Sequence, residues 1–285
     1  EMKARWRAGY QDLDGDGASE IIFGRNVFDI EGNVKWSGTH DSGGDLNYGF
    51  VSIAADINLD GFQEVIAGRT VYAHDGTVIS DAVLPSDGYT ALGNFDNDDE
   101  AEIVLVGSGM ISVRNYDGSL LWGPLVLPNT WFGRGFGGAP TVGDFDGDGQ
   151  PEVGVAAKEY YVVYETDGSI KWKAKNRDYS SHRTGSSLFD FEGDGRIEVL
   201  YADEEFLRVY DGATGIVRFA VENASGTVLE YPVVADVDND GSADILVGGD
   251  MFRRLSSEST SWAPTRSIWN QYAYYIDNIN NDLTV

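Results

Sequence analysis

The sequence of 285 residues contains no cysteine and has only 20 basic side chains against 47 acidic ones. The absence of cysteine excludes disulfide bonds, thiolate metal sites and cysteine nucleophiles. A formal net charge of −27 argues against nucleic-acid binding, because phosphate backbones are bound by clustered lysine and arginine. No apolar run approaches the roughly 20 residues of a membrane-spanning helix, so we expect no direct membrane insertion.

What the sequence does contain is an acidic motif whose copies begin 38–50 residues apart. The full motif has oxygen-bearing side chains at positions one, three, five and nine, and glycine at position six. Six copies and a degenerate seventh are found, near residues 12–20, 56–64, 94–102, 144–152, 190–198, 236–244 and 278–285. This period is typical of one four-stranded blade of a β-propeller.

The residues around each motif predict four β-strands per period. Apolar, β-branched runs precede the motif, as at 50–54, and follow it, as at 20–23. A third run, such as 160–164, leads to an Asp-Gly pair and then to a fourth run that often contains tryptophan, as at 170–172. Such runs are strand signals, and Asp-Gly between two of them is a strong hairpin signal. We therefore predict an all-β fold, with residues 1–285 forming a single β-propeller domain.

Seven blades of four antiparallel strands fit the repeats best, and six blades are the alternative. Six full periods are visible, and a run at 272–276 resembles the first strand of a seventh. The run at 2–6 resembles a fourth strand with no earlier strands before it. Pairing the two chain ends within one blade would remove the exposed sheet edges, so we predict closure by the N- and C-terminal strands. The tryptophans of the fourth strands are predicted to be packing anchors between neighbouring blades.

The motif predicts a calcium site in each of the six complete copies. Alternating carboxylates wrap oxygen ligands around a hard cation, glycine at position six permits a left-handed turn, and position seven offers its backbone carbonyl. An oxygen-only set with this charge favours Ca²⁺ over Mg²⁺ or a transition metal. The predicted ligands are Asp12, Asp14, Asp16, Ala18, Glu20, Asp56, Asn58, Asp60, Phe62, Glu64, Asn94, Asp96, Asp98, Glu100, Glu102, Asp144, Asp146, Asp148, Gln150, Glu152, Asp190, Glu192, Asp194, Arg196, Glu198, Asp236, Asp238, Asp240, Ser242 and Asp244.

These loops resemble the FG-GAP repeats of integrin α-subunit propellers and of bacterial VCBS-type repeat proteins. The fourth copy even has the run Phe136-Gly137-Gly138-Ala139-Pro140 ahead of its acidic loop. The runs 262–266 and 269–271 resemble the closing element of large bacterial surface proteins with such repeats. The resemblance implies that each calcium loop joins the first two strands of a blade and that ligands dock on the opposite face. The third copy departs from the pattern, with Asn94 at position one and Asp99 in place of glycine.

Ligand recognition is predicted in the connections that lead from the fourth strand of one blade to the first strand of the next. These connections are long and variable and contain aromatic and basic residues, and variable loops on a rigid scaffold are common recognition sites. The candidate residues are His40, Tyr48, Trp131, Arg134, Tyr179, His182 and Arg183.

We predict a calcium-stabilised binding or adhesion module that recognises a glycan or protein ligand on a surface. We expect it to be part of a larger multidomain chain at the cell surface or outside the cell, where calcium fills sites with dissociation constants of about 10⁻⁴–10⁻³ M. No motif indicates catalysis, so a non-enzyme is predicted. Two alternatives stay open: a polysaccharide lyase, since lyases that degrade pectin also use calcium-rich propellers, and a structural spacer without a ligand.

Overall fold

The computed structural model describes residues 9–40, 43–45, 49–82, 87–128, 137–227, 231–258 and 261–265. Within these ranges the chain forms strands, turns and loops, and none of it is a helix that could cross a membrane. The predicted all-β class is confirmed. The described residues fall into two compact units, one ending at Val126 and the other beginning at Leu127. The single domain, the seven blades and their closure stay predictions, since the segments 2–6 and 272–285 lie outside the described residues.

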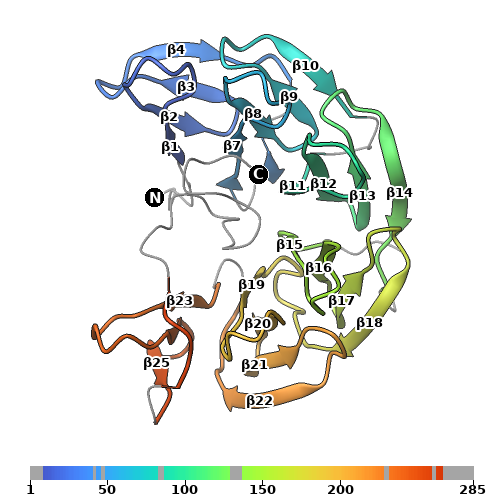
Figure 1. Ribbon diagram of the computed structural model, residues 1–285, viewed down its shortest axis with the longest axis vertical. Helices are drawn as coiled ribbons and strands as arrows, with labels where there is room; N and C mark the ends of the chain where they lie inside the picture. The colour runs from blue at the N-terminus through green and yellow to red at the C-terminus, as the bar shows by residue number, and fades with distance from the viewer. Residues whose placement is uncertain are drawn as a thin grey trace. The chain divides into compact units, whose positions relative to one another are not determined.

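The first unit contains three four-stranded antiparallel sheets whose strands follow one another in sequence order (Figure 1). The first sheet consists of β1 (Gly9–Gln11), β2 (Glu20–Phe23), β3 (Asn26–Phe28) and β4 (Val34–Ser37). The second consists of β7 (Ile53–Ala55), β8 (Glu64–Ala67), β9 (Thr70–Tyr72) and β10 (Val78–Asp81). The third consists of β11 (Tyr89–Gly93), β12 (Glu102–Gly107), β13 (Met110–Arg114) and β14 (Leu120–Val126). A short ribbon that the sequence did not predict, β5 (Gly44–Asp45) with β6 (Gly49–Phe50), lies between the first two sheets in the chain.

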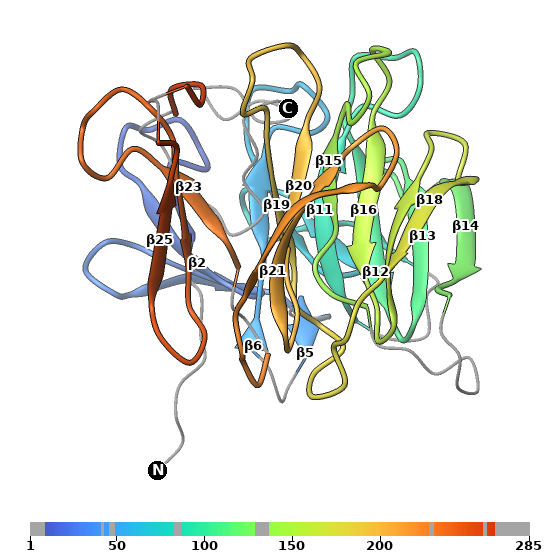
Figure 2. The ribbon, with the colours of Figure 1, turned by 90° about the horizontal axis from the view of Figure 1, so that it is seen from below.

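The second unit repeats this arrangement with two four-stranded sheets and one of three described strands. Its first sheet consists of β15 (Thr141–Gly143), β16 (Glu152–Ala156), β17 (Tyr160–Tyr164) and β18 (Ile170–Lys175). The next consists of β19 (Ser186–Phe189), β20 (Glu198–Ala202), β21 (Phe206–Asp211) and β22 (Val217–Glu222). The last consists of β23 (Val233–Ala235), β24 (Asp244–Val247) and β25 (Arg253–Ser256). In Figure 2 the axes of β15, β16, β19 and β20 are roughly aligned, although paired strands are antiparallel, and the connecting loops lie at the two ends of the strands.

Neighbouring sheets within a unit pack through shared apolar cores, and this explains which strands are buried. In the first unit Ile22 of the first sheet and Val65 of the second belong to one cluster, and in the second unit Leu200 and Ile245 join their two sheets in the same way. All six residues of β12 are buried, as expected of a continuous apolar run that is covered on both faces. Fourth strands such as β14 are mostly exposed.

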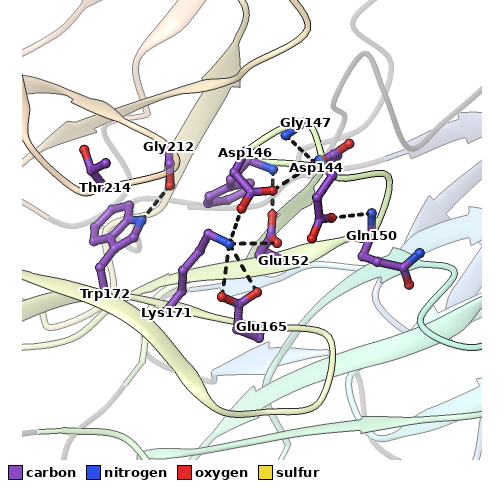
Figure 3. A network of polar contacts seen from close by, with 12 residues as sticks. Asp144, Asp146, Gly147, Gln150, Glu152, Glu165, Lys171, Trp172, Gly212 and Thr214 are labelled. Atoms are coloured by element: carbon purple, nitrogen blue, oxygen red, sulfur yellow. Dashed lines mark hydrogen bonds and ion pairs between the residues drawn. The ribbon is translucent and has the colours of Figure 1, made fainter.

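The tryptophans of two fourth strands bind the turn of the following sheet, which confirms their predicted anchoring role. Trp36 Nε1 donates a hydrogen bond to the carbonyl of His74 (2.8 Å), and Trp172 Nε1 donates one to the carbonyl of Gly212 (2.6 Å) (Figure 3). The rings also cover the glycines of these turns, because a Cβ on Gly76 would lie 2.8 Å from Trp36 Cδ2.

Two turn glycines separate the effect of this packing from that of backbone strain. Gly32 and Gly76 hold the same place in the turns between the third and fourth strands of their sheets, with φ of +86° and +87°, but nothing lies within 4 Å of a Cβ on Gly32. Both alanine variants carry the strain of a left-handed backbone, whereas only Gly76→Ala overpacks Trp36, so we expect it to lose about 1–3 kcal/mol more. Urea denaturation of the two variants measures the difference, and equal losses would contradict the packing argument.

A register shift recurs between the third and fourth strands of all five four-stranded sheets. In the first sheet Val27 pairs with Trp36 while Phe28 pairs with Val34, so the residue between them has no partner opposite it. A bulge of this kind re-aims the side chain of the extra residue. The residues at this place are Lys35, Ile79, Leu121, Lys171 and Arg218.

Candidate metal centres

Each acidic loop joins the first two strands of its sheet, and most of them fold around the carboxylate at position one. In the fourth loop Asp144 Oδ1 accepts a hydrogen bond from the amide of Gly147 (2.7 Å), and Asp144 Oδ2 accepts one from the amide of Gly149 (2.8 Å) (Figure 3). The amide at position six donates to the same carboxylate in four other loops: Gly17 to Asp12, Gly61 to Asp56, Gly195 to Asp190 and Gly241 to Asp236, at 2.8–3.0 Å. The five glycines have φ between +85° and +92°, which explains the residue type at position six.

The third loop is the exception that its sequence predicts. Asn94 Nδ2 donates to the carbonyl of Asp98 (2.6 Å), so the amide at position one acts as a donor instead of an acceptor. Asp99 at position six is not among the residues with positive φ. The third loop therefore closes by a different hydrogen bond from the other five.

The carboxylate at position five orients the backbone of position seven in all six loops. Its Oδ1 accepts the amide of position seven at 2.7–3.0 Å: Ala18, Phe62, Glu100, Gln150, Arg196 and Ser242. That the carbonyl of position seven is a calcium ligand stays a prediction.

Position nine is the first residue of the second strand, and its carboxylate is buried in every loop. One of its oxygens accepts the amide of position two at 2.5–3.1 Å: Leu13 to Glu20, Ile57 to Glu64, Phe95 to Glu102, Phe145 to Glu152, Phe191 to Glu198 and Val237 to Asp244. The acid that ends the motif thus fastens the start of the loop to the sheet and leaves its second oxygen for another partner.

Carboxylate oxygens converge in five of the six loops. Within each group one oxygen of each residue lies within 4.8 Å of the others: Asp12, Asp14 and Glu20; Asp96, Asp98 and Glu102; Asp144, Asp146 and Glu152; Asp190, Glu192 and Glu198; Asp236, Asp238 and Asp244. Two oxygens that bind one calcium ion at 2.3–2.6 Å lie at most about 5 Å apart, so the spacing suits a shared ion. The second loop has Asn58 at position three and so one carboxylate fewer, and Asn58 Oδ1 accepts the amide of Asp60 (2.9 Å).

The buried carboxylates at position nine are costly to ionise without a cation nearby. Burial raises the pKa of Glu64 to about 7, with the charges of Asp60 and Asp56 adding to the effect. Burial likewise raises the pKa of Glu102 to about 7, reinforced by Asp96 and Asp98. A divalent ion among these oxygens would favour the ionised forms, so the donor set fits calcium in chemistry as well as in spacing.

Basic side chains that the sequence analysis missed reach four of the six loops. Lys171 Nζ lies 2.5 Å from Asp146 Oδ2, 3.3 Å from Glu152 Oε1 and 3.0 Å from Glu165 Oε1 (Figure 3). Three further residues contact positions three and nine of their own loops: Lys35 with Asp14 and Glu20, Arg218 with Glu192 and Glu198, and Arg254 with Asp238 and Asp244. The signal in the sequence was a basic residue three places after the glycine of the Asp-Gly or equivalent turn, at 32, 168 and 215.

Consecutive loops are joined to one another through the backbone. The amide of Gln63 donates to the carbonyl of Leu13 (3.0 Å), which links position eight of the second loop to position two of the first. The amide of Ala101 reaches the carbonyl of Ile57 in the same way (3.0 Å). In the second unit Ala263 bridges two loops, donating to the carbonyl of Phe191 (2.8 Å) and accepting from the amide of Ala243 (3.1 Å).

The candidate ligand residues differ in how accessible they are. His40 is exposed, and Tyr179 is 48% exposed with Lys158 Nζ 5.1 Å and the Arg177 guanidinium carbon 5.5 Å from its ring centroid. His182 is partly buried, and Arg183 is buried. Tyr48, Trp131 and Arg134 lie outside the described residues. Of the predicted set, Tyr179 offers the clearest aromatic surface to a ligand.

Asp178, which the sequence analysis did not single out, organises the loop that carries Tyr179. Its side chain is fully buried, and its two oxygens accept the amides of the four residues from Ser181 to Thr184 at 2.9–3.2 Å. Thr227 Oγ1 donates to the same carboxylate (2.7 Å) from the next connection between sheets. The loop between β18 and β19 is therefore preformed, not an unstructured linker.

The segment that contains the fifth and sixth acidic loops matches a known protein family. Residues 190–247 match a family model described as FG-GAP-like repeat. This segment is similar to an FG-GAP-like repeat. The matched FG-GAP-like segment runs from position one of the fifth loop to the end of β24 and so includes two acidic loops. The resemblance inferred from the sequence is confirmed. No curated protein matches the sequence of this chain.

Solved structures with similar folds include a matrix protein and several lyases. The biofilm matrix protein Bap1 of V. cholerae is similar with a TM-score of 0.76 and 20% identity, over 98% of this chain and 73% of Bap1. A Bacillus licheniformis rhamnogalacturonan lyase gives a TM-score of 0.55 and 19% identity, over 94% of this chain and 47% of the lyase. The exotype rhamnogalacturonan lyase YesX gives 0.56 and 19%, over 90% of this chain and 45% of the lyase. At these identities the likeness shows the fold alone, and the chain spans less than half of each lyase.

Proposed function

We propose that this protein is a calcium-stabilised binding module of an extracellular or surface-anchored protein, built as a β-propeller. The observation that carries the proposal is the convergence of carboxylate oxygens in loops that recur in phase along the chain. Backbone amides already hold the position-nine carboxylate in all six loops and the position-one carboxylate in five of them. The fold likeness to a biofilm matrix protein and the FG-GAP-like repeat support a surface role.

The ligand is a glycan or a protein that meets the ends of the sheets opposite the acidic loops. Tyr179 lies at such an end with Lys158 and Arg177 beside its ring, and Arg177 also pairs with Glu204 (3.4 Å) and Glu205 (2.5 Å). An aromatic ring flanked by cations suits an acidic sugar, which stacks on the ring and pairs its carboxylate with the bases.

Two measurements on the intact chain test this proposal. Equilibrium dialysis against millimolar calcium, which exceeds the expected dissociation constants of about 10⁻⁴–10⁻³ M, should find several bound calcium ions per chain. A panel of acidic and neutral polysaccharides should contain a ligand whose binding is lost in Tyr179→Ala and kept in His74→Ala. His74 is a control because its ring, like that of Tyr179, packs against a neighbouring side chain, here Phe62 (4.3 Å), but at the acidic-loop end of its sheet. If binding is kept in Tyr179→Ala and lost in His74→Ala, the ligand binds at the acidic-loop end of the sheets, which contradicts this proposal.

A polysaccharide lyase is the second candidate, and the lyase folds among the similar structures favour it. Lyases release unsaturated sugars that absorb ultraviolet light. Steady formation of such products from any polysaccharide of the panel would show that the protein is a lyase and would contradict the proposed function as a binding module.

A further inference from the structure

The extra residue of the fourth-strand bulge lies beside the acidic loop of the same sheet. In the first, fourth and fifth sheets this residue is Lys35, Lys171 or Arg218, and its side chain contacts the carboxylates at positions three and nine. Lys35 Nζ, for example, lies 3.0 Å from Asp14 Oδ2 and 2.7 Å from Glu20 Oε1. In the last sheet, whose described part has three strands, Arg254 of β25 makes the same two contacts.

These four loops therefore have both oxygens of the position-nine carboxylate occupied. In Glu152, Oε2 accepts the amide of Phe145 (2.7 Å) and Oε1 faces Lys171 Nζ (3.3 Å) (Figure 3). The charged group of a lysine or arginine side chain thus contacts the same carboxylates that a metal ion would bind.

The second and third loops differ in this respect. Their bulge residues are Ile79 and Leu121, and no side chain of the described part forms an ion pair with Glu64 or Glu102. Each of these acids is only 1% exposed and uses one oxygen for the amide of position two. The second oxygen of each acid therefore has no built-in positive charge beside it among the described residues.

We propose that the bulge residue sets how strongly each loop depends on a divalent ion. Loops one, four, five and six carry a built-in cation that partly neutralises their carboxylates and competes with calcium. Loops two and three have none, and they are the loops that require the ion. The inference rests on the proposed calcium binding and adds to it a ranking of the six sites that the motif itself does not contain.

The fourth loop provides the first test, through Lys171→Met, which keeps the length of the side chain and removes its charge. Hydrogen exchange of the peptide 144–152 is followed by mass spectrometry during a calcium titration, so the readout belongs to one loop. The calcium midpoint of this loop should fall roughly tenfold, the effect of a unit charge on a divalent ion across about 5 Å of water-like surroundings. Lys173→Met is the matched control, because Lys173 lies on the same strand with its Nζ over the Tyr160 ring (5.1 Å). A midpoint in Lys171→Met that equals or exceeds that of Lys173→Met overturns the proposal.

The reverse change, Ile79→Lys, keeps the test open if Lys171→Met fails to fold. It should raise the calcium midpoint of the peptide 56–64 by a similar factor and slow the exchange of this peptide in chelator. Unaltered exchange of 56–64, with and without calcium, would contradict the proposal.

Calcium titration of the wild-type chain separates failure of the proposed calcium binding from failure of the proposed role of the bulge residue. If none of its six loops responds to calcium, the proposed function fails and the inference fails with it. If the loops respond but neither variant shifts its own loop, only the inference fails.

Discussion

Removal of calcium is expected to lower the melting temperature of this protein by about 15–30 °C. An ion that binds only the native state stabilises it by RT ln(1 + [Ca²⁺]/Kd), about 1.4 kcal/mol per site at tenfold excess over Kd. Six such sites contribute about 8 kcal/mol, which is comparable to the whole stability of a typical domain. For a chain of this size 1 kcal/mol corresponds to about 2–4 °C.

Calorimetry in the presence of a chelator measures this effect, and readdition of ions identifies the metal. Calcium should restore the melting temperature better than magnesium, because Mg²⁺ demands a tighter octahedral geometry and gives up its water reluctantly. A melting curve that stays in place after elemental analysis has shown the metal to be gone would contradict calcium stabilisation.

The second large effect is expected from Asp178→Ala in the loop between β18 and β19. The change leaves the amides of Ser181, His182 and Thr184 without this acceptor, whereas the amide of Arg183 keeps Ser181 Oγ (3.2 Å) and Thr227 Oγ1 keeps Ser180 Oγ (3.0 Å). A buried donor without a partner costs about 1–3 kcal/mol, and partial relaxation still leaves an expected loss of at least about 3 kcal/mol.

Asp167→Ala is the matched control for this variant. Asp167 also accepts a backbone amide, that of Ser169 (2.9 Å), but it does so in the exposed turn between β17 and β18. Urea denaturation should therefore give a clear loss for Asp178→Ala and little change for Asp167→Ala. Equal losses would mean that Asp178 does not organise the loop that presents Tyr179.

The strands next to the acidic motifs were predictable from the sequence, because local residues determine them. The runs 20–23, 64–67, 160–164 and 244–247 match β2, β8, β17 and β24 at both ends. Each of the three that follow an acidic motif begins at position nine, where a buried acid is tied to position two, so the motif itself fixes the boundary. First strands were harder: the run 50–54 corresponds to β7 at Ile53–Ala55, since its earlier residues belong to the connection and not to the sheet.

The parts of the site that escaped prediction depend on pairing between strands. In the sequence Lys35 and Lys171 look like ordinary basic residues of an exposed fourth strand. In the structure a bulge directs each of them toward the acidic loop, and a bulge is not recognisable in a single sequence. Asp178 escaped for a related reason, because its partners are backbone amides and a hydroxyl that only the folded loop brings together. The motif assigned the acids to calcium, and the bases that share them were overlooked.

If the acidic loops bind calcium as proposed, we expect the backbone hydrogen bonds between consecutive loops of the first unit to couple their ions. Leu13 lies between a carboxylate of its own loop, Glu20, and the amide of Gln63 in the next, so an ion that fixes the first loop also fixes an acceptor for the second. Such coupling is reciprocal, because two linked sites change each other's binding free energy by the same amount. We therefore expect the three acidic loops of the first unit to respond to rising calcium more steeply than any one of them would alone.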